Sequence, residues 1–347
     1  MLRYIATRSC QYAWQSLKNC VKLLLGRKLY RDERLIFFRQ YILHRARIRH
    51  IRGITSVDYS GYPGAAAQAH RIMNTQNFAR VYGFPYLHTP FVCINHADRP
   101  MQEWAAAWEA VFNLGAGENL CDGRKDVVNY GCVASDFLLC FGQGGEEARL
   151  AENFRAMIPE FRAKYYANKL RRPTRHLTVA VHIRRGDVSA HKNSELFAST
   201  AVVAQTIREV KSSLDSWGQP YSISLYSQDN RSNFEELWPL NVDLFLDADA
   251  TWTLQKLIEA DILIMAKGNF SYYAGIVSEG IKLFEPWLIP PAVVTLFPSS
   301  NWRIVSQTDD WVMCQADGSF DRSSFERKLA LLLEAKRKTA VAGPGSM

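Results

Sequence analysis

The sequence predicts an α/β protein built of two Rossmann-like domains that face a cleft. Strand-like and helix-like segments alternate along most of the chain, which is typical of a parallel, doubly wound sheet. A chain of 347 residues with 48% apolar content suits two domains better than one. One buried strand, 177–183, ends in charged residues, and open α/β sheets bind ligands beyond the carboxyl ends of such strands.

Residues 1–52 are predicted to form a basic, helical N-terminal segment. Residues 1–53 hold thirteen Lys and Arg against two acidic residues, so this part carries +11 while the whole chain carries +8. Two interpretations stay open: a helix packed on the protein with a solvated basic face, or an amphipathic helix on an anionic membrane. The aromatic-basic interleaving of nucleic-acid modules is lacking, so we expect no nucleic-acid partner. The apolar residues at helical spacing are Trp14, Leu17, Val21, Leu24 and Leu25.

The lengths of the apolar runs and the cysteine content indicate the cellular compartment. No apolar run reaches the roughly 18–20 residues that span a bilayer, and the N-terminus lacks the pattern of a secretory signal. The seven cysteines are odd in number and show no C-x-x-C spacing, which favours a reducing compartment. We therefore expect a cytoplasmic protein, with peripheral contact to anionic membrane through residues 1–50 as an open alternative.

The first α/β domain is predicted over 53–173. Its last helix should end before Pro173, because proline disfavours helix in the residue that precedes it. A boundary near that proline separates it from a second domain, 174–347. The predicted elements of the first domain are a strand at 53–59, a loop at 60–64, a helix at 65–82, an extended segment at 85–92, helices at 103–114 and 146–170, and between these two a short apolar run at 125–131.

The second domain shows a cleaner alternation, which predicts a parallel, doubly wound sheet. Its predicted strands are 177–183, 221–226, 242–246, 261–265 and a last strand that begins at Lys282. Its predicted helices are 195–214, 233–237, 252–259 and 270–278.

Strand 177–183 leads directly into two arginines, a glycine and a carboxylate. The planar guanidiniums of Arg184 and Arg185 match phosphate oxygens bidentately. Gly186 allows a positive φ or a close backbone approach, and Asp187 can hold an arginine in place. Adjacent arginines are often only a solvated surface, but this pair follows a strand that should be interior. The sequence therefore predicts an anion site at this strand end.

A second motif follows strand 261–265, where small and polar residues open a helix. A helix start of this kind presents free N–H donors, and Ser271 adds a hydroxyl. We expect Asn269 to cap the helix. Phosphate suits both motifs.

The two motifs, in this order, resemble those of the GDP-fucose-dependent fucosyltransferases: the α1,2 and α1,6 enzymes, the nodulation-factor enzymes and the protein O-fucosyltransferases. The resemblance is strongest over 177–290. It implies a GT-B-like fold and an inverting transfer of fucose from GDP-fucose to a glycan acceptor, without metal or other cofactor. The domain at 53–173 would lie on the acceptor side of the cleft, and the domain at 174–347 would bind the nucleotide sugar, with Ser271 facing Arg184 and Arg185 across the crevice. The nucleotide-sugar site that it implies comprises His182, Arg184, Arg185, Asn269, Phe270 and Ser271, with the early loop at Gly61 and Gly64 facing the cleft.

Two positions depart from the family's pattern. Thr253 stands where an acidic residue that contacts guanine is usual, which puts the identity of the base in doubt. Lys267 stands where serine is usual and adds a positive charge near the phosphate site.

Three candidates for the general base lie on the loop after the arginines: Asp187, His191 and Glu195. Arg184 is expected to stabilise the leaving diphosphate, so Arg184, Asp187 and Glu195 form the predicted catalytic set.

Two rival functions stay open. The pair Asp247 and Asp249 stands near a strand end and has the Asp-x-Asp spacing of metal-dependent glycosyltransferases. Asp249 is equally well placed as a helix cap, and no metal site is predicted. The second rival is a non-catalytic protein that binds nucleotide or associates with membrane.

Overall fold

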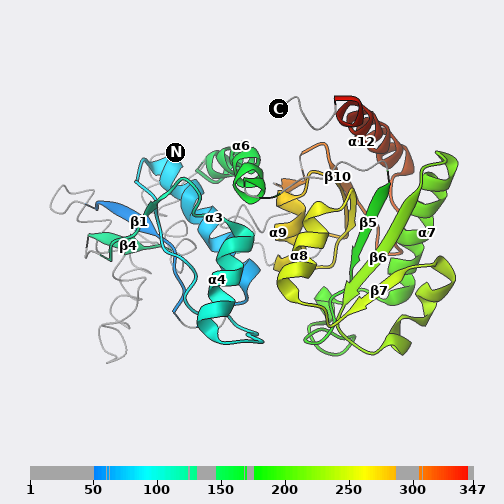
Figure 1. The fold of residues 1–347 in the computed structure, drawn as a ribbon, viewed down its shortest axis with the longest axis horizontal. Helices are drawn as coiled ribbons and strands as arrows, with labels where there is room; N and C mark the ends of the chain where they lie inside the picture. The colour runs from blue at the N-terminus through cyan, green and yellow to red at the C-terminus, as the bar shows by residue number, and fades with distance from the viewer. Residues whose placement is uncertain are drawn as a thin grey trace, which may run out of the picture.

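The computed structural model describes residues 51–59, 61, 63–123, 126–130, 146–167, 169, 176–286, 305–306 and 308–342. The predicted amphipathic helix within 1–50 lies outside these residues. Among the helices of this part of the chain, none is long and apolar enough to cross a membrane. Figure 1 shows two α/β halves side by side, with helices of both halves between the sheets.

The N-terminal half contains a small parallel sheet. Strand β1 pairs with β4 and β2 pairs with β3, and an isolated bridge between Ile54 and Tyr86 links the two pairs. The strand order is therefore β3-β2-β1-β4, as in the first half of a Rossmann fold. The elements are β1 (Gly53–Thr55), α3 (Ala65–Tyr82), β2 (Leu87–His88), α4 (Met101–Phe112), β3 (Asn119–Leu120), β4 (Val127–Asn129) and α6 (Glu146–Tyr166).

The C-terminal half is a complete Rossmann-like unit. Its six strands are ordered β10-β9-β8-β5-β6-β7, and every pairing is parallel. In order of appearance this is the doubly wound arrangement 3-2-1-4-5-6. The elements are β5 (Leu177–His182), η2 (Ser194–Leu196), α7 (Thr200–Ser216), β6 (Tyr221–Ser227), η3 (Arg231–Leu240), β7 (Asp243–Leu246), α8 (Ala250–Glu259), β8 (Ile262–Ile264), α9 (Asn269–Val277), β9 (Ile281–Phe284), β10 (Trp311–Met313) and α12 (Arg322–Ala342).

The predicted fold class, two Rossmann-like sheets in an α/β chain, is confirmed. Two element predictions are wrong. The strand that begins near Lys282 is not the last, because β10 follows and pairs with it. The helix predicted from 195 begins only at Thr200, because Ser199 accepts a hydrogen bond from the Val202 N–H and so caps α7. A short 3₁₀ turn, η2, occupies the earlier residues.

Helices from both halves share one hydrophobic core. Phe112 of α4, Phe161 of α6 and Tyr273 of α9 are buried in the same cluster, and the rings of Phe112 and Tyr273 lie 4.5 Å apart. Burial of this much aromatic surface holds the halves together, since each such ring removes a large apolar area from water.

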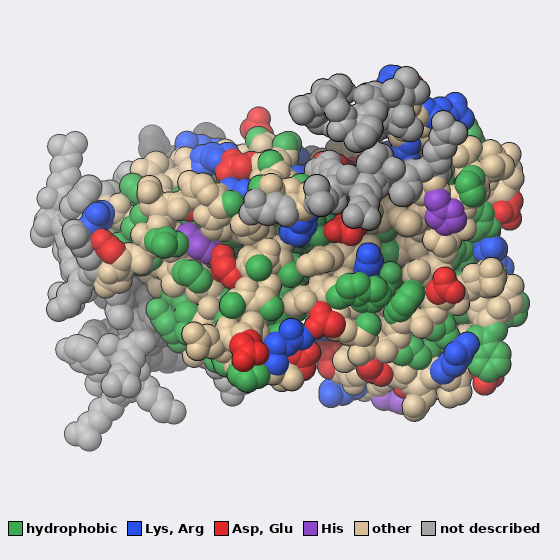
Figure 2. All heavy atoms as spheres, viewed as in Figure 1, with side chains coloured by type: hydrophobic (Ala, Val, Ile, Leu, Met, Phe, Trp, Pro, Cys, Tyr) green, Lys and Arg blue, Asp and Glu red, His purple; other side chains and the backbone are tan. Residues whose placement is uncertain are grey.

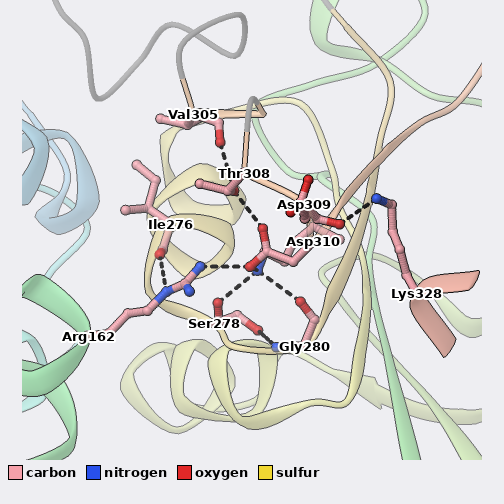
Figure 3. A network of polar contacts seen from close by, with 10 residues as sticks. Arg162, Ile276, Ser278, Gly280, Val305, Thr308, Asp309, Asp310 and Lys328 are labelled. Atoms are coloured by element: carbon pink, nitrogen blue, oxygen red, sulfur yellow. Dashed lines mark hydrogen bonds and ion pairs between the residues drawn. The ribbon is translucent and has the colours of Figure 1, made fainter. Parts of the chain in front are cut away.

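A buried polar network also joins α6 to the C-terminal sheet (Figure 3). Arg162 donates to the Ile276 carbonyl at the end of α9 (3.1 Å) and to the Asp310 carboxylate (2.9 Å). Lys282, which is fully buried on β9, donates to the same carboxylate and to the carbonyls of Ser278 and Gly280 (2.8 Å each). Burial lowers the pKa of Lys282 to about 7, and the nearby Asp310 charge partly offsets this effect.

The described surface does not carry a large patch of one charge on the face seen in Figure 2, where Lys and Arg are interspersed with Asp and Glu. Counted by sequence, the basic excess of the chain belongs to residues 1–53. The net positive charge of the chain thus comes from its N-terminal segment, whereas the charges on this face of the described residues are mixed.

Candidate functional site

The strand order reverses between β5 and β8, which lie next to each other at the centre of the C-terminal sheet. The connections after these two strands run to opposite faces of the sheet, and this leaves a crevice beyond their carboxyl ends where ligands bind in such folds. The two sequence motifs follow these two strands. The tertiary structure thus brings together the arginine motif after β5 and the serine motif after β8.

A cavity of about 800 Å³ opens at this point. One wall is formed by the strand ends of the C-terminal half and the other by the N-terminal half, from the start of α3 at Gly64 to the loop at 95–98 and α4. A volume of this size accommodates a ligand of nucleotide-sugar dimensions. The predicted site residues that line it are His182, Arg184, Arg185, Asp187, Asn269, Phe270, Ser271 and Gly64.

Arg184 presents a fixed guanidinium at the centre of the C-terminal wall. Its Nε and Nη2 donate to the two carboxylate oxygens of Asp187, at 3.1 and 2.6 Å. These hydrogen bonds hold the pKa of Asp187 below its usual range. The third nitrogen, Nη1, lies beside Gly268, where a Cβ would stand only 2.5 Å away. Gly268 has φ +145°, which glycine tolerates best, so its position lets the arginine approach the start of α9.

Arg185 has a different environment. Its side chain is buried, and Nη2 donates to the Ala198 carbonyl at 2.9 Å. Nη1 donates to the backbone carbonyl of Arg184 at 2.9 Å, and the guanidinium lies 4.5 Å from the ring centroid of Phe197. Burial lowers the pKa of Arg185, but no carboxylate is bonded to it. The donors of Arg185 therefore fix the loop 185–200, although part of the residue lines the cavity.

His182 and Ser271 connect the two motifs directly. The Nδ1 of His182 and the hydroxyl of Ser271 lie 2.6 Å apart, and the Ala266 N–H donates to the same hydroxyl at 3.1 Å. Burial and then the neighbouring Arg184 charge lower the pKa of His182 to about 4, so the imidazole is neutral at pH 7. A neutral ring can accept the serine proton at Nδ1, which leaves Nε2–H as a donor.

The first turn of α9 lines the same crevice, and the first N–H groups of a helix have no partner within it. Gly268 is the N-cap residue and makes no side-chain cap, so the predicted capping role of Asn269 is wrong. The Asn269 carbonyl accepts a hydrogen bond from Nε2 of His70 on α3, at 3.0 Å. Phe270 packs edge-on against Trp108 of α4, with centroids 6.3 Å apart. Both contacts fix the start of α9 against the N-terminal half.

Other residues of the sequence analysis fall in three groups. Lys267 lines the cavity and pairs with Glu285 at 2.7 Å. Thr253 also lines the cavity, at the first turn of α8. Gly61, His191 and Glu195 are not among the residues of the cavity wall, and the last two are exposed on the loop that carries η2.

The two aspartates of the Asp-x-Asp pair have separate roles. Asp249 caps α8 by accepting from the Trp252 N–H at 2.8 Å, and it also pairs with Arg99 of the N-terminal half. Burial alone would raise the pKa of Asp249, but its hydrogen bonds, including those from Thr251 and Arg99, lower it to about 2. Asp247 lines the cavity, whereas Asp249 is not in its wall. Within the described residues, no cluster of three or more His, Cys, Asp or Glu is arranged to hold a metal ion.

The N-terminal wall contains residues that the sequence analysis missed. His96 and Asp98 come from the loop between β2 and α4, and Trp104 and Trp108 come from α4. Both tryptophans are almost fully buried, and neither indole N–H has a hydrogen-bond partner among the described residues. The loop has no motif, and its only local signal is the polar sequence between two apolar segments.

Comparisons with known proteins show limited likeness. No family model and no curated protein matches the chain. Similar solved structures include POFUT1 in complex with GDP, at 13% identity and TM-score 0.30 over 66% of this chain and 96% of that one. The E. coli heptosyltransferase WaaC with ADP-2-deoxy-2-fluoro heptose has 10% identity and TM-score 0.34, over 81% of this chain and 99% of that one. An α,α-trehalose 6-phosphate synthase from Burkholderia multivorans has 10% identity and TM-score 0.25, over 92% and 76%. At these identities and TM-scores, the likeness by itself indicates no function for this chain.

Proposed function

We propose that this protein is a glycosyltransferase that transfers fucose from GDP-fucose to a glycan acceptor, with inversion and without a metal ion. One observation carries the proposal. The guanidinium of Arg184 lies against Gly268 at the start of α9, at the switch point of the C-terminal sheet, in a cavity of about 800 Å³. This geometry joins an arginine and a helix N-terminus at one anion site.

The diphosphate would be held by charges and dipoles that are already in place. Arg184 would bind its oxygens, oriented by Asp187, and the free N–H groups of α9 would add further donors. Lys267 would add a positive charge at the edge of the site, although Glu285 balances part of it. Donors fixed before the reaction stabilise a leaving group at little reorganisation cost, which is the main source of catalysis in such sites.

The identity of the donor rests on the motifs. His182, Arg184 and Ser271 occupy the positions that resemble the GDP-fucose-dependent enzymes, and they meet at one place in the cavity. The neutral ring of His182 would offer its Nε2–H to the donor. Thr253 lies in the same cavity, where the family's pattern has an acidic residue, so preference for guanine needs a direct test.

The test is calorimetric titration of GDP, UDP and ADP into the wild-type protein and Arg184→Ala, with chelator present. We expect selective GDP binding that is lost or strongly weakened in the variant. Arg208→Ala, which changes an exposed arginine on α7, is the matched control and should bind like the wild type. Preference for UDP, or binding that requires added Mn²⁺, would contradict the proposal. Binding of GDP without release of GDP from GDP-fucose would indicate a non-catalytic protein.

A further inference from the structure

The proposed transfer needs a base for the proton of the acceptor hydroxyl, and the candidates from the sequence suit this task poorly. Both carboxylate oxygens of Asp187 accept hydrogen bonds from Arg184, which lowers the pKa of Asp187 and makes it a weaker base. His191 and Glu195 do not belong to the cavity wall. We therefore expect the general base among other residues of the cavity.

Inversion at the anomeric carbon restricts the general base to one wall of the cavity. The acceptor oxygen must attack the sugar from the side opposite the leaving diphosphate, which the start of α9 and Arg184 would hold on the C-terminal wall. The base must then come from the N-terminal wall. The titratable residues of that wall are His96 and Asp98. Asp98 is bonded to Arg99 at 2.7 Å, and Arg99 in turn pairs with Asp249.

His96 is free to take this role. Its imidazole makes no hydrogen bond or ion pair with any described residue, so neither ring nitrogen is occupied. The backbone of His96 has φ +60°, and its N–H donates to the Asn95 side chain at 2.9 Å. Histidine and asparagine enter this left-handed region more readily than most residues. The His96 backbone thus takes a sparsely populated conformation at a residue of the cavity wall.

His96 and Asp187 line the same cavity from opposite walls. The hydrogen bonds from Arg184 are the main cause of the low pKa of Asp187, and the charge of His96 is the smallest of the causes that lower it. The charged groups that share the cavity with His96 are Asp98 on its own loop and, on the opposite wall, Arg184, Arg185, Asp187, Lys192, Asp247 and Lys267.

We infer that His96 is the general base of the transfer, an inference that rests on the proposed function. The acceptor oxygen forms a bond to the anomeric carbon while the bond from that carbon to the β-phosphate oxygen breaks. The electron pair of the broken bond leaves with GDP. The proton of the acceptor hydroxyl moves to a neutral ring nitrogen of His96 and is then released to solvent.

The test uses His96→Asn, because asparagine tolerates the same backbone but cannot take a proton. Release of GDP from GDP-fucose is measured with water and with a panel of glycan acceptors. We expect turnover to fall by about 10²- to 10⁴-fold, the usual effect of losing a general base, with GDP affinity by calorimetry within about twofold of wild type. The matched control, His176→Asn, changes an exposed histidine just before β5, at the end of that strand opposite the cavity, and should not alter turnover.

Two further measurements separate a base from a merely structural residue. Azide is an anionic nucleophile that needs no base, so it should restore GDP release in His96→Asn but not in Arg184→Ala. His96→Asp, which keeps a basic group on a residue that tolerates left-handed backbone, should retain part of the activity. Turnover in His96→Asn equal to wild type, or a loss that azide does not relieve, would overturn the inference while leaving the proposed function intact. A wild-type protein that neither binds GDP nor releases it from GDP-fucose would overturn both.

Discussion

The two walls of the cavity are built in different ways. On the C-terminal wall, the charged group of Arg184 and the hydroxyl of Ser271 follow regular strands, and hydrogen bonds to neighbouring residues fix both of them. On the N-terminal wall, His96 and Asp98 come from a loop, and the imidazole of His96 has no bonded partner among the described residues. A rigid wall suits recognition of a diphosphate that every donor shares, whereas a loop wall can vary with the acceptor.

A second contrast lies within the C-terminal wall, between neighbouring arginines. Arg184 bonds a carboxylate and faces the cavity, while Arg185 is buried and bonds backbone carbonyls. The side chain of Arg184 is available to bind a ligand, whereas the side chain of Arg185 holds the loop that follows the two arginines. Adjacent residues of identical chemistry can thus have separate roles, and the following variants test this contrast and the one between the walls.

The largest effect is expected from Arg184→Ala. Removing the guanidinium should lower turnover of GDP-fucose by about 10²- to 10³-fold, because a fixed donor to developing charge is lost. The melting temperature should change little, since the side chain is partly exposed and its partner Asp187 can be hydrated. Turnover is followed by release of GDP, and melting by calorimetry. Arg184→Lys keeps the positive charge but loses the planar, bidentate guanidinium, so its turnover should lie between those of the wild type and Arg184→Ala. A large fall in melting temperature would instead identify Arg184 as structural.

Arg185→Ala should lower stability more than GDP binding, which is the opposite of the pattern expected for Arg184→Ala. It removes a buried donor from the Ala198 carbonyl and the packing against Phe197, so we expect a loss of about 2–3 kcal/mol in the free energy of unfolding. GDP binding should weaken only through the loosened loop. Urea unfolding and calorimetry on the same samples measure both quantities. If Arg185→Ala abolished GDP binding without a loss of stability, the division of roles between the two arginines would be wrong.

The junction between the halves should show a characteristic pH dependence. The unfolded chain holds a proton on Lys282 up to the ordinary lysine pKa of about 10.4, but the folded protein releases it above about pH 7. Between these values the unfolded state binds more protons, so stability should rise with pH, by about 2 kcal/mol between pH 7 and 9. The urea midpoint measured against pH checks this. Lys282→Met should remove most of the rise of the urea midpoint with pH, whereas Lys338→Met, which changes an exposed lysine, should leave that rise in place. A urea midpoint that falls between pH 7 and 9 would contradict the prediction.

The smallest effect is expected from Asp249→Asn. Asparagine caps a helix as well as aspartate does, so this variant removes mainly the charge of the Arg99 pair, which joins the two halves of the protein at a partly exposed position. Such pairs contribute little to stability, and turnover should stay within about twofold of wild type. The assay is run with chelator and with added Mn²⁺. A loss of 100-fold or more, together with dependence on Mn²⁺, would favour the metal-dependent alternative built on Asp247 and Asp249.

Local patterns predicted most of the C-terminal half. The β-branched run at 177–183 was recognised as a strand, and Gly186 does take a positive φ, +78°. Strand β10 was missed because a strand of three residues is too short to show a period. The Asn269 cap was wrongly predicted because a glycine can begin a helix when the backbone around it is held by other contacts. In both cases tertiary contacts overrode a weak local signal.

The sequence by itself determined the fold class, the two motifs and the residue types of an anion site, because strand periodicity, turn glycines and adjacent guanidiniums are local properties of the chain. Only the tertiary structure decided which arginine faces the cavity, that His182 bonds Ser271, and that His96 lies opposite them. These facts depend on the order of strands in the sheet and on how α3, α4 and α6 pack against α8 and α9. Such contacts join residues far apart in the chain, and no local pattern encodes them.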